Sequence, residues 1–272
     1  MLDEKGLIRY SRQLILKEVG ASGQEKLLRS KVLVVGAGGL GSPALYYLAA
    51  AGVGILGVAD FDVVGISNLQ RQILYTTGEL NRRKADVAAE KLESLNPDVK
   101  VVKYPLRMNS DNIEEIISSY DVIVDATDNF TARYLVSDCC HFKGKPLVEG
   151  AVLGFAGTLM TIVPGKTPCY RCLYPVPPEE GAVPTCSETG IMGMVAGTIG
   201  TMQALEAVKL LLGIGETLSG RMLFYDGLSM SVNEVVVERN KNCPLCGENP
   251  TITELEEYEM NYCAAKVKDV EI

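Results

Sequence analysis

The stretch KVLVVGAGGLGSPALYYLAAAGVGILGVAD, residues 31 to 60, decides the fold. The β-branched run at 31–35 is typical of a strand buried in a parallel sheet. The Ala- and Leu-rich residues 42–51 predict a helix, and residues 54–60 predict the next strand. The segment therefore predicts a βαβ unit.

A glycine motif joins this first strand to the helix. Gly36, Gly38 and Gly41 have the spacing G-x-G-x-x-G, and Gly39 lies between them. Glycines let the backbone approach a phosphate, towards which amides at a helix N-terminus point. Asp60 ends the second strand, about 20 residues further on, where an acid can hydrogen-bond a ribose hydroxyl. These residues suit NAD as well as ATP.

Strands and helices continue to alternate through the first half of the chain. We predict strands at 99–103, 121–126 and 146–149. Helices are predicted at 4–19, 79–95, 111–118 and 130–142, and a short second helix follows the first and ends by residue 29. The runs at 157–165, 221–226 and 232–237 look antiparallel, and a long helix is expected at 189–212. The predicted fold class is α/β: a Rossmann-like doubly wound sheet, parallel in the first half with antiparallel additions in the second. We expect one domain over 1–247 and an acidic tail over 248–272.

Composition excludes several classes of protein. Lys and Arg total 26 against 34 Asp and Glu, a net charge of -8, which disfavours nonspecific binding to nucleic acid or to an anionic membrane. Eight Cys in 272 residues are too few for a disulfide scaffold. The opening residues MLDEKGLIRY lack the apolar region of a secretory signal, so we expect a cytoplasmic protein. Glycines and Pro43 interrupt the charge-free run at 32–59, which argues against a membrane span.

The segment DFDVVGISNLQRQ, residues 60–72, favours ATP over NAD. A dehydrogenase has no evident need for Asn68, Arg71 and Gln72 beyond the ribose-binding acid, whereas these residues suit a polyphosphate. Asp62 lies in the same segment. Loops after the carboxyl ends of parallel strands share one crevice, so this segment should meet the glycine motif there.

Two further segments are expected to reach that crevice. The sequence DATDN, residues 125–129, follows a predicted strand and supplies Asp128 and Asn129. Lys84 lies in the first turns of the helix predicted at 79–95. Simpler interpretations stay open: Asp60 as a turn residue, Arg71 and Lys84 as surface charges, and Asp128 as the helix N-cap.

Together these motifs resemble the E1-like adenylating enzymes of the MoeB/ThiF/HesA group, which activate ubiquitin-like sulfur carriers. The resemblance covers nearly the whole chain and rests on RYSRQ at 9–13, GAGGLG at 36–41, DFD at 60–62, SNLQRQ at 67–72, Lys84-Ala85, TDN at 127–129 and two C-x2-C pairs. It implies ATP-dependent adenylation of the C-terminal Gly carboxylate of a small β-grasp sulfur carrier ending in Gly-Gly. The product would be an acyl adenylate, formed with pyrophosphate before sulfur transfer.

The resemblance also implies roles for individual residues. Asp60 matches the ribose ligand, Asn68, Arg71 and Lys84 match triphosphate contacts, and Asp128 matches the acid that helps to hold Mg2+. Arg12 resembles an arginine donated across a dimer interface, which implies a homodimer. The reaction needs a cationic site, because an anionic carboxylate has to attack the α-phosphate of an anionic nucleotide. Two unit charges about 4 Å apart repel by about 4 kcal/mol at an effective dielectric of about 20.

The cysteines divide into a paired set and single residues. Cys169, Cys172, Cys243 and Cys246 form two C-x2-C pairs that match tetrahedral zinc, and the family places structural zinc there. Metal-free thiols or a redox pair remain alternatives. Cys186, in the segment PTCSETG, is a candidate nucleophile. The resemblance implies two alternatives, because the matching cysteine forms a covalent link to the carrier in some relatives and is dispensable in others.

The remaining thiols and the single histidine suggest no chemistry. Cys139 and Cys140 are expected in the core, and Cys263 has no evident role. His141 is the only histidine and is expected to be structural, which excludes histidine-dependent nucleophilic catalysis.

Three alternatives to the predicted function stay open. An NAD-dependent oxidoreductase would use the glycine motif and Asp60 but leaves Arg71 and Lys84 unexplained. A catalytically silent module that binds a ubiquitin-like partner is the second. Adenylation of a peptide or of a tRNA-linked carboxylate is the third and closest.

Overall fold

The computed structural model describes residues 2–178 and 189–256. Within them the chain forms one eight-stranded sheet with the strand order β3-β2-β1-β4-β5-β6-β7-β8. The first five strands are parallel and the last three antiparallel. Their bounds are β1 Lys31–Val35, β2 Ile55–Ala59, β3 Lys100–Tyr104, β4 Val122–Asp125, β5 Leu147–Leu153, β6 Ala156–Ile162, β7 Arg221–Asp226 and β8 Ser231–Val236. The predicted fold class is confirmed.

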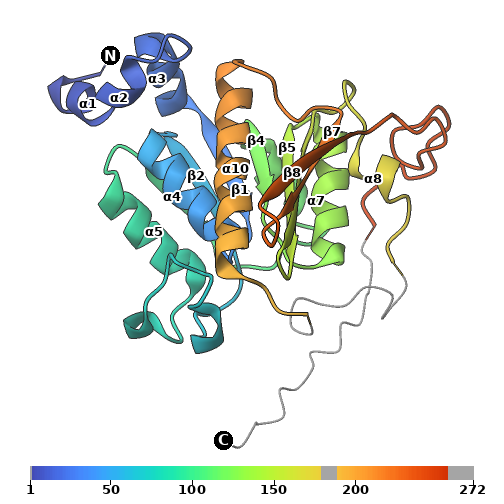
Figure 1. Ribbon diagram of the computed structural model, residues 1–272, viewed down its shortest axis with the longest axis horizontal. Helices are drawn as coiled ribbons and strands as arrows, with labels where there is room; N and C mark the ends of the chain where they lie inside the picture. Colours follow the sequence, from blue (N-terminus) through green and yellow to red (C-terminus); the bar gives the residue numbers. More distant parts are fainter. Residues whose placement is uncertain (1, 179–188, 257–272) are drawn as a thin grey trace, which may run out of the picture.

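Helices cover both faces of the sheet (Figure 1). Their bounds are α1 Glu4–Arg9, α2 Ser11–Leu14, α3 Gly20–Arg29, α4 Gly41–Ala51, α5 Lys84–Leu95, α6 Ile113–Ser118, α7 Phe130–Lys143, α8 Tyr170–Leu173 and α10 Gly193–Leu212. One apolar core lies between the sheet and α4, α5 and α10, and contains Leu45, Leu92 and Ile199. A second core on the opposite face contains Ile117 of α6 and Leu135 of α7. The fold is thus a three-layer sandwich.

Three predicted helices begin or end elsewhere. The helix expected at 4–19 is two short helices interrupted at Tyr10, whose ring is buried. The helix expected from Glu79 begins at Lys84, since Asn81 adopts a positive φ of 66°. The helix expected from Thr189 begins at Gly193, because the backbone of Met192 hydrogen-bonds to Gly154 at the β5–β6 turn.

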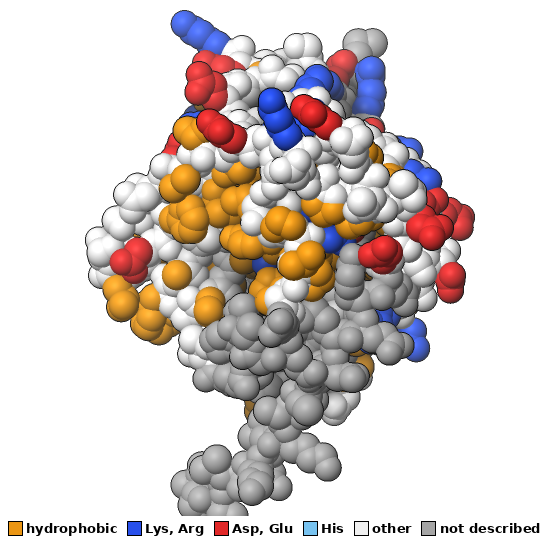
Figure 2. Space-filling view, turned by 90° about the vertical axis from the view of Figure 1, so that its right-hand side faces the viewer, with side chains coloured by type: hydrophobic (Ala, Val, Ile, Leu, Met, Phe, Trp, Pro, Cys, Tyr) orange, Lys and Arg blue, Asp and Glu red, His pale blue; other side chains and the backbone are white. Residues whose placement is uncertain are grey.

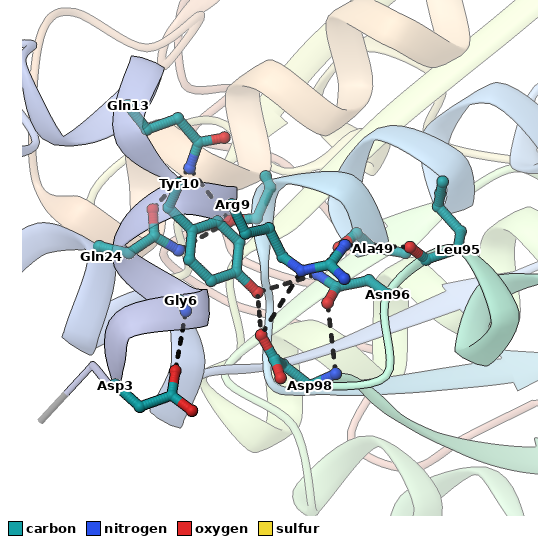
Figure 3. A network of polar contacts seen from close by, with 11 residues as sticks. Asp3, Gly6, Arg9, Tyr10, Gln13, Gln24, Ala49, Leu95, Asn96 and Asp98 are labelled. Atoms are coloured by element: carbon teal, nitrogen blue, oxygen red, sulfur yellow. Dashed lines mark hydrogen bonds and ion pairs between the residues drawn. The ribbon is translucent and has the colours of Figure 1, made fainter.

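A polar network fixes the N-terminal helices to the end of the sheet opposite the glycine turn (Figures 1 and 3). The Tyr10 hydroxyl donates to Asp98 Oδ2 (3.1 Å) and accepts from Asn96 Nδ2 (2.9 Å). Asn96 Nδ2 also donates to the Ala49 carbonyl (2.7 Å) near the end of α4. Gln13 Nε2 of α2 donates to the Ala51 carbonyl (3.1 Å). Helices α1 and α2 therefore pack against the C-terminal ends of α4 and α5.

Helix α10 is the one described helix long and apolar enough to span a membrane by length and composition. Half of its most apolar window is buried in the molecule. It packs on α4, β4, β5 and β6, as a core helix of a globular domain does. The charge-free run at 32–59 is divided into β1, the glycine turn, α4 and β2, as predicted.

Candidate active site

The glycine turn is enclosed by the carboxyl ends of β2 and β4. Gly36 has a φ of +92°, and its amide donates to the Ala59 carbonyl (2.8 Å). A Cβ at Gly36 would lie 2.6 Å from the carbonyl oxygen of Ala126. A Cβ at Gly41 would lie 1.9 Å from the Gly36 carbonyl oxygen. Only glycine fits these two positions, which explains the first and third glycines of the motif.

Asp60 lies directly beside this turn. Its Oδ2 accepts from the Ala37 amide (2.8 Å) and its Oδ1 from the Asp62 amide (2.9 Å). Burial raises the pKa of Asp60, and the positive charge of Lys84 partly offsets that effect. Each carboxylate oxygen keeps a lone pair for a further donor such as a ribose hydroxyl. Asp60 therefore holds the loop after β2 against the glycine turn, and its role as the ribose ligand stays a prediction.

Lys84 is the first residue of α5, and its side chain is buried, so it is not a surface charge. Its Nζ lies 2.9 Å from Asp62 Oδ2, which is half-exposed. Asp62 is two residues after Asp60 in the sequence, so this contact holds the ammonium group of Lys84 close to the loop that carries Asp60. Lys84 therefore belongs to the predicted crevice.

Arg71 and Gln72 pack against the glycine turn from the segment that follows β2. A Cβ at Gly39 would lie 3.4 Å from Arg71 Cγ, and one at Gly38 would lie 3.5 Å from Gln72 Nε2. Arg71 Nη1 donates to the Ser67 carbonyl (3.0 Å). The buried Gln72 Oε1 accepts no hydrogen bond from the residues that the structure describes. The stem of Arg71 is thus held at the glycine motif.

Asn68 has a structural task in the same segment. Its Oδ1 accepts from the Gly65 amide (3.1 Å) and caps the short turn Ile66–Asn68. The side-chain amide nitrogen of Asn68 is the part left for a ligand.

Asp128 follows a tightly held residue at the end of β4. The amide and hydroxyl of Thr127 both donate to Asp125 Oδ1 (2.9 and 2.7 Å). Asn129 Oδ1 accepts from the Ala132 amide (2.9 Å) and is the N-cap of α7. The interpretation of Asp128 as the N-cap is therefore wrong. Asp128 is exposed, and its carboxylate has no capping role.

A buried polar cluster beneath this loop was not anticipated from the sequence. Arg133 of α7 lies 3.2 Å from Glu149 Oε1 of β5, and both side chains are buried. Gln203 Nε2 of α10 donates to the Asp125 carbonyl (2.6 Å). A lone carboxylate in the apolar run PLVEGAV was the signal available in the sequence.

The structure gives no contact with this crevice for two predicted catalytic residues, one of which lies outside the described ranges. Arg12 is an exposed residue of α2, at the opposite end of the sheet from the glycine turn (Figure 1). Cys186 lies outside the described ranges 2–178 and 189–256, as does Cys263. The structure therefore tests neither the contribution of Arg12 from a partner copy nor the covalent role of Cys186.

The residues expected to be structural are placed as predicted. Cys139 and Cys140 are fully buried in α7. His141 is partly buried, and burial lowers the pKa of its imidazole.

The four paired cysteines form one compact cluster. All four sulfur atoms lie within 4.8 Å of one another. The separations are 3.8 Å for Cys169–Cys172, 3.5 Å for Cys169–Cys243 and 3.4 Å for Cys172–Cys246. A tetrahedron with Zn–S bonds of about 2.3 Å places its sulfurs about 3.8 Å apart. The cluster fits a closed structural zinc site of four thiolates.

The residues after this cluster are partly packed against it. The amides of Thr251 and Ile252 both hydrogen-bond to the Pro244 carbonyl, and Ile252 is buried. The predicted domain boundary at residue 247 stays a prediction.

The crevice suits a magnesium-bound nucleoside triphosphate. The glycine turn leads into the N-terminus of α4, where backbone amides can bind phosphate, and Lys84 and Arg71 supply positive charge beside the turn. The exposed carboxylate of Asp128 is the oxygen ligand that Mg2+ prefers.

Comparisons with known proteins agree with this geometry. A family model described as the ThiF family matches residues 10–245. The chain is 51% identical to the sulfur carrier protein adenylyltransferase of Thermus thermophilus, covering 93% of this chain and 95% of that protein. It is 52% identical to the SAMP-activating enzyme E1 of Haloferax volcanii, covering 91% of each.

A longer relative and a solved structure extend the comparison. The chain is 50% identical to the adenylyltransferase and sulfurtransferase MOCS3 of Arabidopsis thaliana, over 89% of this chain but 53% of that protein. The crystal structure of E. coli MccB with MccA-N7isoASN has a TM-score of 0.78 at 23% identity, over 88% of this chain and 74% of that one. At that identity the likeness shows the fold alone.

Proposed function

This chain belongs to the ThiF family, and from that membership we propose that it is an ATP-dependent adenylyltransferase. It activates the C-terminal carboxylate of a small ubiquitin-like sulfur carrier. A carboxylate oxygen of the carrier attacks the α-phosphorus of ATP, the bond to the bridging oxygen breaks, and pyrophosphate leaves. The product is the carrier acyl adenylate, ready for sulfur transfer.

One observation supports this proposal: the acidic and basic groups of the segment 60–72 and Lys84 at the start of α5 lie together beside one glycine turn. Arg71 packs on Gly39, Lys84 reaches Asp62, and Asp60 binds the Ala37 amide. The reaction brings two anions together, so cations at this place lower its barrier. Asp128 would hold Mg2+, which when bound withdraws charge from the phosphates.

The same observation argues against the alternatives. Binding of NAD needs only the glycine turn and Asp60, and it leaves Lys84 and Arg71 without a role. A silent binding module would have no use for a buried lysine beside the ribose acid. The named relatives favour a sulfur carrier over a peptide or a tRNA-linked carboxylate.

A homodimer would complete the site. Arg12 lies on α2, far from the glycine turn of its own chain, so it can serve the reaction only from a second copy. In support, α4 and α10 expose apolar side chains, among them Tyr47 and Met194. An open hollow on this face is lined by both helices. Such a surface is typical of a subunit interface.

The carrier itself requires another surface. Apolar side chains gather on the face seen from the side of α8 (Figure 2). The β7–β8 hairpin exposes Phe224, Leu228, Met230, Val232, Val235 and Val236. Exposed apolar residues in such numbers indicate contact with another protein. The cytoplasmic location stays a prediction, and the thiolate cluster is compatible with a reducing compartment.

ATP–pyrophosphate exchange tests the proposed function. The purified protein should exchange label between pyrophosphate and ATP only when a Gly-Gly carrier from the same genome is present. A carrier that lacks its last glycine is the control. Binding of NAD without exchange with any such carrier would overturn the proposal.

A mixing experiment tests the homodimer. Arg12→Ala and Asp128→Ala should each be inactive alone. When they are co-refolded, mixed dimers contain one intact site, so about a quarter of the wild-type activity should return. If the mixture stays inactive while wild-type and variant chains exchange, Arg12 does not act across the interface.

A further inference from the structure

We infer that Arg133 is a positioning residue that sets the place of Asp128 and thereby the affinity of the site for the metal-bound nucleotide. This inference rests on the proposed function. It concerns a buried residue of α7 that lies beneath the loop carrying Asp128.

Arg133 joins the ends of two neighbouring strands. Its Nη2 donates to the Thr127 carbonyl (3.2 Å) and to the Gly150 carbonyl (3.4 Å). Thr127 directly precedes Asp128, and Gly150 lies in β5 beside the end of β4. One guanidinium group therefore holds the peptide that carries Asp128 to the strand next to it.

The surroundings of Arg133 leave its guanidinium little freedom. Its Nε faces Glu149 Oε1 at 3.2 Å as an ion pair without the alignment of a hydrogen bond. Its Cζ lies 5.9 Å from the centre of the Phe130 ring. Tyr170, which lies between Cys169 and Cys172, is close enough to Arg133 for each group to shift the pKa of the other. The planar group is thus fixed on several sides before any ligand binds.

The charges explain why an arginine is needed here. Asp125 and Glu149 are both buried, and burial raises the pKa of each, that of Glu149 to about 7. Burial alone would lower the pKa of Arg133, but Glu149, Tyr170 and Asp125 more than offset it and raise it. A cation is therefore retained between two acids. Only the rigid planar group of an arginine places one nitrogen, Nη2, at two carbonyl oxygens while a second nitrogen, Nε, faces Glu149.

Asp128 is exposed, and the residue before it is the one that the buried cluster holds. Thr127 is held by Asp125 Oδ1 below and by Arg133 at its carbonyl. A shift of about 1 Å in the position of a carboxylate that holds the metal can lower the rate of adenylation by about a hundredfold. Loss of the Nη2 contact with the Thr127 carbonyl should therefore act through Asp128.

The Arg133→Lys variant isolates this role. Lysine keeps the positive charge against Glu149 and Asp125, so folding should survive, but its single nitrogen cannot face Glu149 and bind both carbonyl oxygens at once. Arg171→Lys is the matched control. Arg171 is also buried, and it forms a bidentate pair with Asp138 (2.8 to 3.1 Å) away from the glycine turn.

The readout is ATP binding with and without Mg2+, measured by titration calorimetry on the full chain. In wild type, Mg2+ should strengthen ATP binding. Arg133→Lys should reduce that metal enhancement at least threefold and leave the metal-free dissociation constant unchanged. Turnover should fall by about tenfold to a hundredfold. Arg171→Lys should lower the melting temperature without changing the enhancement.

A double-mutant cycle separates positioning from general damage. Asp128→Asn should abolish the metal enhancement, and adding Arg133→Lys should then change nothing more. The inference is overturned if the double variant loses further affinity, or if Arg133→Lys weakens metal-free binding equally. If wild type itself fails to bind ATP, the proposed function fails, and this outcome is distinct from the others.

Discussion

Replacement of Gly38 by alanine should separate phosphate binding from folding. Gly38 is the middle glycine of the motif, and its φ is not positive. The nearest protein atom to an added Cβ is Gln72 Nε2 at 3.5 Å, an ordinary van der Waals distance. The methyl group would thus fit the folded protein and project into the crevice beside Gln72.

The structure predicts a small effect of Gly38→Ala on stability and a large loss of nucleotide affinity. Because the backbone is compatible with alanine, the free energy of unfolding should change by less than about 1 kcal/mol, and it can even rise. A phosphate oxygen that accepts from the backbone needs to approach within about 3 Å, and a methyl group beside that path prevents it. ATP affinity should fall at least tenfold, or about 1.4 kcal/mol.

Urea unfolding and calorimetric titration with ATP provide the two measurements. Gly41→Ala is the contrasting variant, since its Cβ would lie 1.9 Å from the Gly36 carbonyl oxygen and should destabilise the fold by about 1–3 kcal/mol or more. The reasoning is refuted if Gly38→Ala binds ATP as tightly as wild type. Parallel losses of stability and affinity would refute it as well.

Three further perturbations give distinct outcomes. Asp128→Ala should lose adenylation in the exchange assay but keep its stability, and an active Asp128→Ala protein would contradict the role of this carboxylate. Asn129→Ala should lower the free energy of unfolding in urea by about 1 kcal/mol, because it removes the cap of α7. Cys172→Ser should lose zinc in elemental analysis and lower the melting temperature by about 10 °C, and unchanged values of both would exclude a structural metal. Burial raises the pKa of Glu149 to about 7 from 4.5, so the folded protein binds more protons between these values and its unfolding free energy falls as pH rises from about 4.5 to 7. Glu149→Gln should remove that decline. If the unfolding free energy of the variant, measured in urea, falls between pH 5 and pH 8 as much as that of the wild type, Glu149 is not its cause.

Local patterns were sufficient for the parallel half of the fold. The run at 31–35 and the glycine motif predicted β1, the turn and α4 within a residue or two, because each depends on neighbours in the chain. Helix starts were harder to predict. The start of α5 depends on the positive φ of Asn81, and that of α10 on a hydrogen bond to Gly154, which is distant in sequence.

The candidate site shows the same division. Asp60, Arg71, Lys84 and Asp128 were predicted because the carboxyl ends of parallel strands share one edge, a rule that needs no coordinates. The burial of Lys84 and its contact with Asp62 required the structure. So did the assignment of the α7 cap to Asn129.

By itself, the sequence determined the chemistry available to this protein: a glycine turn, two acids and two basic residues that are candidates for binding a nucleotide and its metal, and two cysteine pairs. Only the tertiary structure decided which of these groups meet. It joined the cysteine pairs into one cluster, and it placed Arg133 between Glu149 and the carbonyl before Asp128. The physical reason is that spacing along the chain restricts local conformation, whereas contacts between distant segments follow from the packing of helices on the sheet.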